Sequence, residues 1–512
     1  MCVWHKKNRK LPGGNCQLPI MPPMRPLLLL LLPLFAFAQR PPNIIWLMAE
    51  DISTDLGCYG FPEVRTPELD RLAAAGQRYT NAFVTNPICS PSRSAMLLGV
   101  HQRRSNTHHH RSNRDVPLAA PFRPLTQLLR EAGYRTVLGH HGVLHRGRKI
   151  DVNFRHEALG PWDGHSQFGL FDRLDSLPTD GRPFFAQIQL AVTHRGDWWE
   201  DISRGAPDRH DPARVTLPPY LADHPAVRAD WARYLDQLEF MDREVGMIRR
   251  ELDSLGLADR TVLIFIGDNG RANLRGKGYL HDSGLRIPLI VYDPTGRWAG
   301  PPVDERVVSA TDLTATILQL AGAELPDYLT GIPLYESPLR RQYVYATRDL
   351  WDEIAERSSA VTSGRWKYIR NDRPAIPWDA GQAYPEFYRP ALHAMRPRHA
   401  AGRLSPAEAI FFAPNKPAEE LYDLTNDPHE LTNLATAPAH AARLAELRAL
   451  TARLDRRYAP RDSSYHPVHP TSVDVLDYVR RHHPEASARM QAGEEIGFGK
   501  YLRMWEDFSR RD

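Results

Sequence analysis

The sequence predicts an α/β fold in which helices flank a large, mostly parallel β-sheet and a smaller C-terminal α+β domain carries an antiparallel sheet. Short apolar runs without polar alternation, which are typical of buried parallel strands, alternate with segments of helical periodicity. From about Tyr343 the pattern changes to short mixed segments separated by turn residues, which favours antiparallel strands.

The apolar runs predict strands over residues 43–48, 136–138, 184–192, 261–266 and 289–292. Between and after them, helical periodicity predicts helices over residues 67–75, 125–132, 229–255 and 313–321. Residues 372–416 are rich in Pro, Arg and aromatic side chains and predict a long irregular excursion, whereas the last fifty residues predict helices.

The N-terminus predicts a secretory leader. Residues 26–38 form an apolar run that follows Arg25 and ends in small residues at Ala38, and the run is too short to span a membrane. Translation would then start at Met21 or Met24. We therefore expect a leader over residues 1–38, cleaved near Ala38, and a secreted or periplasmic protein with no transmembrane segment in the mature chain. A large domain over 39–340, a smaller one over 341–460 and a helical extension over 461–512 would follow.

Loss of the leader changes the charge and the cysteine count. Residues 1–38 contain five basic side chains and no acidic one, so the formal net charge falls from +4 to −1. A chain near neutrality has no bulk basic field, and we expect no nucleic-acid partner. Cys58 and Cys89 remain, and in a secreted protein they either form a disulfide or serve separate roles.

Polar side chains follow three of the predicted strands. Glu50 and Asp51 follow the first strand, His194 follows the strand over 184–192, and Asp268 and Asn269 follow the strand over 261–266. In open α/β sheets ligands bind beyond the carboxyl ends of the strands. One acidic pair could be a helix cap or a turn. Two such oxygen-bearing pairs beside a histidine favour a site for a hard divalent cation, Ca²⁺ or Mg²⁺.

Cys89 lies in the sequence Cys89-Ser-Pro-Ser-Arg93. Pro91 and Ser92 favour a helix start, which places Cys89 where backbone amides stabilise an anion or a polarised nucleophile. A lone cysteine at a helix start is usually only a packed residue. The pattern C-x-P-S-R, with Gly99 six residues further on, resembles the sequence at which cysteine is converted to formylglycine in the type I sulfatases of the alkaline-phosphatase-like superfamily.

This resemblance extends over nearly the whole mature chain. The segments PNIIWLMAED, PFFAQIQLAVTH, IGDNG, RGKGYLHDSG and ELYDLTNDPHELTNL occur in that family's order. Segments within 211–246 and 427–435 resemble the heparan N-sulfatase (sulfamidase) branch, whereas Arg275-Gly-Lys277-Gly is closer to the arylsulfatase type. The resemblance implies an alkaline-phosphatase-like fold, Ca²⁺ as cofactor and a catalytic domain over residues 39–340. It also implies a formylglycine-generating system as a maturation partner.

The resemblance also implies a role for each candidate residue. One hydroxyl of a hydrated formylglycine attacks sulfur and the other later expels sulfate. By position, the calcium ligands would be Glu50, Asp51, Asp268 and Asn269. Cys89 would become the formylglycine, and Arg93 would steady its hydrate. The residues that bind sulfate or assist the leaving oxygen would be Lys149, His194 and Lys277.

Three positions depart from the family pattern. Glu50 stands where most relatives have Asp, and Leu98 replaces a common Thr. Lys149 is aligned across an insertion, which leaves Asp151 where His is commoner, and His140 or His141 could instead fill this second sulfate-binding position.

The expected substrate is a sulfated carbohydrate of glycosaminoglycan type, cleaved at an O-sulfate ester or an N-sulfate (sulfamate). The alternatives are a phosphonate monoester or phosphodiester hydrolase on the same scaffold and a non-catalytic glycan-binding protein. The retained candidate residues argue against the glycan-binding protein.

Overall fold

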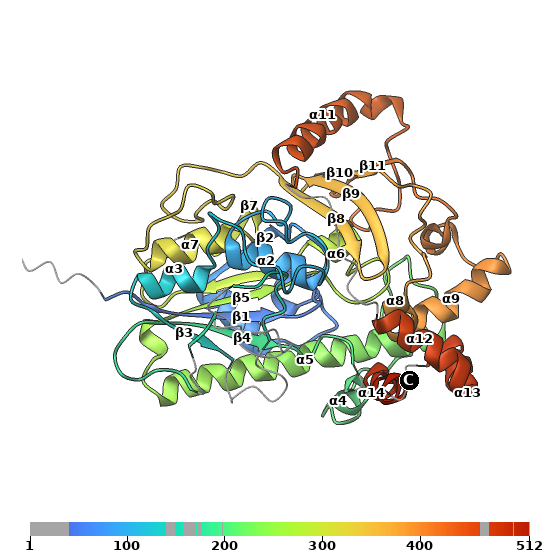
Figure 1. Ribbon diagram of the computed structural model, residues 1–512, viewed down its shortest axis with the longest axis horizontal. Helices are drawn as coiled ribbons and strands as arrows, with labels where there is room; N and C mark the ends of the chain where they lie inside the picture. The colour runs from blue at the N-terminus through green and yellow to red at the C-terminus, as the bar shows by residue number, and fades with distance from the viewer. Residues whose placement is uncertain are drawn as a thin grey trace, which may run out of the picture. The chain divides into compact units, whose positions relative to one another are not determined.

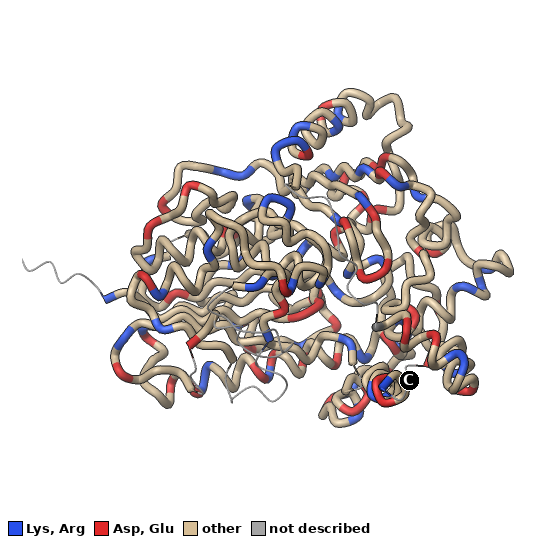
Figure 2. The backbone as a smooth tube through the Cα atoms, in the orientation of Figure 1, with Lys and Arg blue, Asp and Glu red and all other residues tan. Residues whose placement is uncertain are grey.

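The computed structural model describes residues 40–139, 149–156, 170–172, 176–196, 198–298, 300–460, 471–494 and 496–510. The predicted leader, together with His140 and His141, lies outside these ranges. Within them, no helix is both long enough and apolar enough to cross a membrane. Acidic and basic residues are interspersed along the backbone (Figure 2).

The main sheet has seven strands in the order β3-β4-β1-β5-β6-β2-β7 (Figure 1). Strand β1 pairs in parallel with β4 on one side and with β5 on the other, and β6 runs antiparallel to both of its neighbours. This confirms the predicted large, mostly parallel sheet. The strands are β1 (Asn43–Ala49), β2 (Gln77–Phe83), β3 (Arg135–Leu138), β4 (Phe184–Leu190), β5 (Thr261–Gly267), β6 (Leu289–Tyr292) and β7 (Val303–Ser309).

Both faces of this sheet are buried. Along β1, Ile44 and Trp46 belong to one apolar core and Ile45 and Leu47 to the other. Because each face packs against helices, β1, β4 and β5 are buried along their whole length and mostly apolar. On the face of Ile44 lie α2 (Cys89–Leu98), α3 (Leu125–Glu131) and α7 (Asp312–Leu320), and on the opposite face lie α1 (Pro67–Ala75), α4 (Trp199–Arg204) and α5 (Pro225–Ser254).

The predicted antiparallel sheet is confirmed as four strands in the order β11-β10-β9-β8. One of its faces packs on α11 (Ala441–Arg457), where Val361 and Tyr368 share a core with Leu444 and Leu447. Other residues of the sheet, including Ile369, join the core of the main sheet. The strands are β8 (Val344–Trp351), β9 (Ile354–Thr362), β10 (Trp366–Asn371) and β11 (Glu419–Asp423).

Two features differ from the sequence predictions. Strands β2 and β7 were not predicted, because their sequences QRYTNAF and VDERVVS contain too many polar residues to form apolar runs. The prediction of an irregular excursion over 372–416 was wrong, since α8 (Ala383–Tyr388), α9 (Pro390–Ala400) and α10 (Pro406–Ala409) lie there. Pro397 inside α9 and its weak apolar periodicity concealed that helix.

The remaining elements are short helices or follow α11. Helices occupy the end of the described chain, where the sequence predicts them, while the proposed division into domains stays a prediction. These elements are η1 (Gly57–Tyr59), η3 (Ala258–Arg260), α6 (Asp282–Leu285), η4 (Ile410–Phe412), η5 (Pro438–His440), α12 (Thr471–His482), α13 (Pro484–Gln491) and α14 (Phe498–Ser509).

A buried guanidinium links the loop after α2 to the antiparallel sheet and to α11. Arg103, in the loop after α2, donates to Asp349 of β8 at 2.7 and 3.0 Å and to Asp455 of α11 at 3.2 Å. We expect Arg103→Met to destabilise the protein by about 3–5 kcal/mol, because it leaves the buried Asp349 carboxylate without its cation. Arg443→Met, which breaks an exposed pair with Glu446, should cost at most about 1 kcal/mol. Thermal unfolding midpoints measure the effect of both variants. Equal shifts would show that the buried Arg103 contacts stabilise the protein no more than the exposed Arg443 pair does.

Candidate active site

The candidate residues meet at the carboxyl ends of three neighbouring strands. Ala49 of β1 is in register with Gly267 of β5 and with Leu190 of β4. The residues that follow these positions therefore lie side by side. Glu50 donates its amide to the Leu190 carbonyl at 3.1 Å, and Asp268 donates its amide to the Ala49 carbonyl at 2.9 Å.

Three carboxylates and one amide form the floor of the site. Glu50, Asp51, Asp268 and Asn269 are all fully buried. The Asp51 amide donates to Asp268 Oδ1 at 3.0 Å, and Asn269 Nδ2 donates to Asp51 Oδ1 at 2.9 Å. Asp51 has a φ of +50°, a left-handed conformation that is uncommon outside glycine and is held here by these bonds. The structure thus brings together all four predicted metal ligands.

Cys89 is the first residue of α2 and lies beside this floor. Its Sγ donates to Asp51 Oδ1 at 3.8 Å, and one side-chain atom each of Cys89, Asp51 and Asp268 lie within 4.8 Å of one another. Burial, followed by the charge of Asp268, raises the pKa of the thiol well above its ordinary value. The encoded thiol is therefore neutral. Cys58 and Cys89 are both free, so no disulfide joins them.

Arg93, one turn further along α2, crosses beneath the carboxylates. Its Nε donates to Asp268 Oδ2 at 2.9 Å, and a second nitrogen lies 3.6 Å from Glu50 Oε1. A third donates to Gln189 Oε1 at 2.6 Å. Ser92 Oγ also donates to the Asp268 carbonyl at 2.5 Å. These contacts fix α2, and with it Cys89, against the ends of β4 and β5.

Two lysines approach the carboxylates from different segments. Lys149 Nζ donates to Glu50 Oε2 at 2.6 Å, and Lys277 Nζ lies 2.9 Å from Asp51. Although burial disfavours its charge, Asp51 raises the pKa of Lys277 well above its ordinary value, so this ammonium stays protonated. Lys149 therefore joins the cluster, while His140 and His141, the alternatives for its position, lie outside the described residues.

His194 completes the cluster in the neutral state. Its Nδ1 lies 2.8 Å from the Arg195 carbonyl, which can only accept, so Nδ1 carries the proton and Nε2 has a free lone pair. Nε2 lies 3.9 Å from Glu50 Oε2. Burial and the nearby charges of Lys277 and Lys149 hold the pKa of His194 well below its usual range. This imidazole can accept a proton at Nε2.

Calcium fits this donor set. Glu50 Oε1 and Asn269 Oδ1 are buried and have no hydrogen-bond partner among the described residues. Buried polar atoms are rarely left in that state, and an unsatisfied one can mark a ligand of a metal ion. The other oxygens belong to Asp51 and Asp268, so the candidate ligands are all oxygen atoms, which suits Ca²⁺ better than a softer metal.

Sequence reasoning missed several residues that position this cluster. Two of these residues, Gln187 and Gln189, lie on β4. Gln187 donates to the Lys149 carbonyl at 3.2 Å, and Gln189 accepts from the Arg93 guanidinium at 2.6 Å. Two buried glutamines inside an apolar strand were the available signal. Tyr384 of α8, whose ring centre lies 5.1 Å from Lys277 Nζ, had no such signal, because it lies in the segment predicted to be irregular.

The comparisons with known proteins agree with this geometry. The Sulfatase family model matches residues 42–323, more than half of the chain. The chain belongs to the sulfatase family. An ulvan-active sulfatase of Formosa agariphila is 30% identical over 456 residues, covering 80% of this chain and 73% of that protein. N-sulphoglucosamine sulphohydrolase of Homo sapiens is 29% identical over 469 residues, covering 82% and 91%.

One solved structure shows the same fold. It is a complex with the substrate D-glucosamine-2-N,6-O-disulfate, and it has a TM-score of 0.58 and 15% identity. The match covers 83% of this chain and 99% of the chain in the solved structure. The predicted family and fold class are thus confirmed, and this sulfatase is a sulfuric ester hydrolase.

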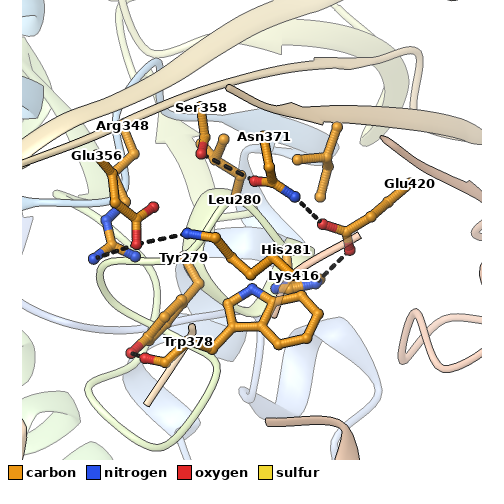
Figure 3. A pocket seen from close by; sticks show the side chains of 11 residues that line it. Tyr279, Leu280, His281, Arg348, Glu356, Ser358, Asn371, Trp378, Lys416 and Glu420 are labelled. Atoms are coloured by element: carbon orange, nitrogen blue, oxygen red, sulfur yellow. Dashed lines mark hydrogen bonds and ion pairs between the residues drawn. The ribbon is translucent and has the colours of Figure 1, made fainter. Parts of the chain in front are cut away.

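In this sulfatase the antiparallel sheet supports the Lys277 segment. Arg389 donates to the Lys277 carbonyl at 2.7 Å, and the guanidinium of Arg348, on β8, lies 5.0 Å from the centre of the Tyr279 ring. Tyr279 also borders a small polar cavity between this segment and the sheet (Figure 3), in which Lys416 and Glu356 lie 2.8 Å apart. The lysine is therefore positioned from the C-terminal half of the chain.

Gly278, which follows Lys277, has no room for a side chain. Its φ is +92°, and a Cβ there would lie 1.8 Å from the Trp351 ring. We expect Gly278→Ala to displace Lys277 and to lower kcat on an aryl sulfate by about a hundredfold. Gly133→Ala is the matched control, because its φ is +88° but a Cβ there meets nothing within 4 Å. Equal kcat values for the two variants would show that the contact with Trp351 does not matter.

Proposed function

We propose that this sulfatase hydrolyses sulfate from a sulfated carbohydrate, using formylglycine derived from Cys89 and a calcium ion. The observation that carries the proposal is the convergence on Cys89 of four oxygen ligands, Arg93 and two lysines. These side chains come from the ends of β1 and β5, from α2 and from the segments of Lys149 and Lys277, and packing alone does not require so many buried charges together.

The chain's own residues would divide the work. Lys149 and Lys277 donate hydrogen bonds to the sulfate oxygens and balance their charge, and such donors are each worth roughly 10²–10³ in rate. His194 accepts a proton at Nε2 and returns it to the leaving oxygen or nitrogen. Arg93 holds the nucleophile's helix in place. Formylglycine, when formed, supplies a hydroxyl nucleophile that the neutral Cys89 thiol does not offer.

Glu50, Asp51, Asp268 and Asn269 would hold the calcium ion. When bound, the ion supplies positive charge that stabilises the negative charge developing on the sulfuryl oxygens. It also offsets the repulsion among three buried carboxylates. The longer side chain of Glu50 is compatible with calcium, whose coordination geometry is flexible.

The names of the relatives support a saccharide substrate. One relative is described as active on ulvan and another as an N-sulphoglucosamine sulphohydrolase, and the structural neighbour binds a glucosamine disulfate. These include O-sulfated and N-sulfated sugars, so both bond types belong to the proposal. We also propose that residues 1–38 direct secretion or periplasmic export and that a formylglycine-generating system matures the enzyme.

Cys89→Ala should abolish turnover without unfolding the protein, because alanine is well tolerated at a helix start. In active enzyme the peptide containing Cys89 should have lost one sulfur and two hydrogens and gained one oxygen. The measurements are peptide mass spectrometry and sulfate release from glucosamine N-sulfate, glucosamine 6-O-sulfate, ulvan oligosaccharides and one phosphodiester.

Two results would redirect the assignment. Inactivity on every sulfated sugar with clear phosphodiester turnover would favour the phosphonate monoester or phosphodiester hydrolase. Saccharide binding with no turnover by fully converted enzyme would favour a glycan-binding protein. Full activity with an unmodified Cys89 thiol would refute the formylglycine step.

Chelation should remove activity, and Ca²⁺ should restore it better than Zn²⁺, because the ligands are oxygen atoms. Asp268→Ala should weaken calcium affinity by about a hundredfold, whereas Glu50→Asp should change it less than about tenfold. Calcium titration monitored by sulfate release measures both variants. Unchanged activity after exhaustive metal removal would show that the four residues are not metal ligands.

A further inference from the structure

We propose that Arg111, held in place by Asp151, binds a second anionic group of the substrate at the mouth of the site, next to the sulfate that is cleaved. This inference rests on the proposed function and narrows its substrate class to saccharides with at least one further sulfate or carboxylate group.

Arg111 belongs to a loop that is built onto the active-site helix. Its amide donates to Ser90 Oγ at 3.0 Å, and Ser90 directly follows Cys89. Asn153 ties the same loop to α2, since its amide donates to Ser94 Oγ at 2.7 Å and its Oδ1 accepts from the Asn113 amide at 2.9 Å. The position of Arg111 relative to Cys89 is therefore fixed by hydrogen bonds on both sides of the loop.

The backbone is strained where the loop meets the site. Arg111 has a φ of +57° and Asp151 a φ of +47°, and neither is a glycine. Left-handed conformations at such residues cost free energy and persist where the surroundings impose them, often at ligand sites. Their strain places the two side chains so that Arg111 donates to Asp151 Oδ2 at 3.3 Å.

Asp151 is the carboxylate that holds Arg111, and it is shared with other cations. Its buried carboxylate is shared by Arg111, by Arg114 through a second guanidinium contact, and by Lys149 at 3.8 Å. Asp352, the other carboxylate that lies near Arg111, already accepts from His110 at 2.7 Å. Lys149 is also paired with Glu50 at 2.6 Å, so Asp151 is shared chiefly by Arg111 and Arg114, and the Arg111 guanidinium can still bind an anion from the substrate.

Exposure separates Arg111 from the groups that would hold the cleaved sulfate. The side chains of Lys277, Lys149 and His194 are 4%, 14% and 19% exposed, whereas that of Arg111 is 37% exposed. A partly exposed guanidinium can bind a sulfate or carboxylate through its N–H donors.

The test is a comparison of two saccharides that differ in charge. In a Cys89→Ala background, which prevents turnover, calorimetry measures the Kd of D-glucosamine-2-N,6-O-disulfate and of N-acetylglucosamine 6-sulfate. We expect the disulfate to bind at least about tenfold more tightly. Adding Arg111→Gln should reduce this ratio to less than about threefold, and Arg111→Lys, which keeps the charge but loses the planar fork, should give an intermediate ratio.

Asp151→Asn tests the positioning role. It should lower the ratio as Arg111→Gln does, and the double variant should lower it no further, because the two side chains act together. Arg104→Gln is the matched control from the same loop, since its guanidinium binds the Tyr328 carbonyl, and it should keep the full ratio. A ratio near one before any Arg111 change, or a ratio unaffected by Arg111→Gln, would overturn the inference.

The two proposals can fail separately. Turnover of sulfated sugars by unmutated enzyme with no Arg111-dependent preference refutes only the second anion site. A clear preference for the disulfate, lost in Arg111→Gln, without turnover by fully converted enzyme refutes only the proposed function.

Discussion

Three carboxylates that would repel one another lie buried together at the end of the main sheet. Glu50, Asp51 and Asp268 lie next to each other because β1 and β5 are parallel neighbours. Burial removes water from these charges, so the protein must supply opposite charge close by. Arg93 and Lys277 do so from α2 and from the loop after β5. The placement of both segments therefore depends on this one cluster.

This dependence explains how the two halves of the chain cooperate. No candidate catalytic residue lies beyond Lys277, yet Arg389 binds its carbonyl and Trp351 occupies the space that Gly278 leaves open. Tyr279 donates to the Trp378 carbonyl at 3.0 Å. The antiparallel sheet and the helices beside it thus act as the outer wall of the site, and the core that it shares with the main sheet keeps that wall rigid.

The entrance differs from the floor in how its charges are balanced. On the floor, the described cations are matched by carboxylates and would be joined by a calcium ion. Around Asp151, Arg111 and Arg114 share one buried carboxylate, and the Arg111 side chain is 37% exposed. A site of this kind favours a substrate that carries more than one negative charge.

The sequence by itself determined the main strands, the predicted metal ligands and the cysteine helix. These are local properties: apolar runs fix β1, β4 and β5, and the polar residues that follow them have to emerge at one edge of a parallel sheet. Strands β2 and β7 could not be predicted in this way, because their polar residues are satisfied by neighbours distant in the chain, such as Asp304 accepting from Gln77.

Only the tertiary structure decided which residues surround the cluster. Lys149 was aligned across an insertion, and its contact with Glu50 joins positions that no local pattern connects. The roles of Gln189 and Arg111 likewise depend on side chains from other segments. Sequence periodicity specifies which face of an element is buried, but charge compensation between distant segments is a property of the packed molecule and becomes visible only once the chain is folded.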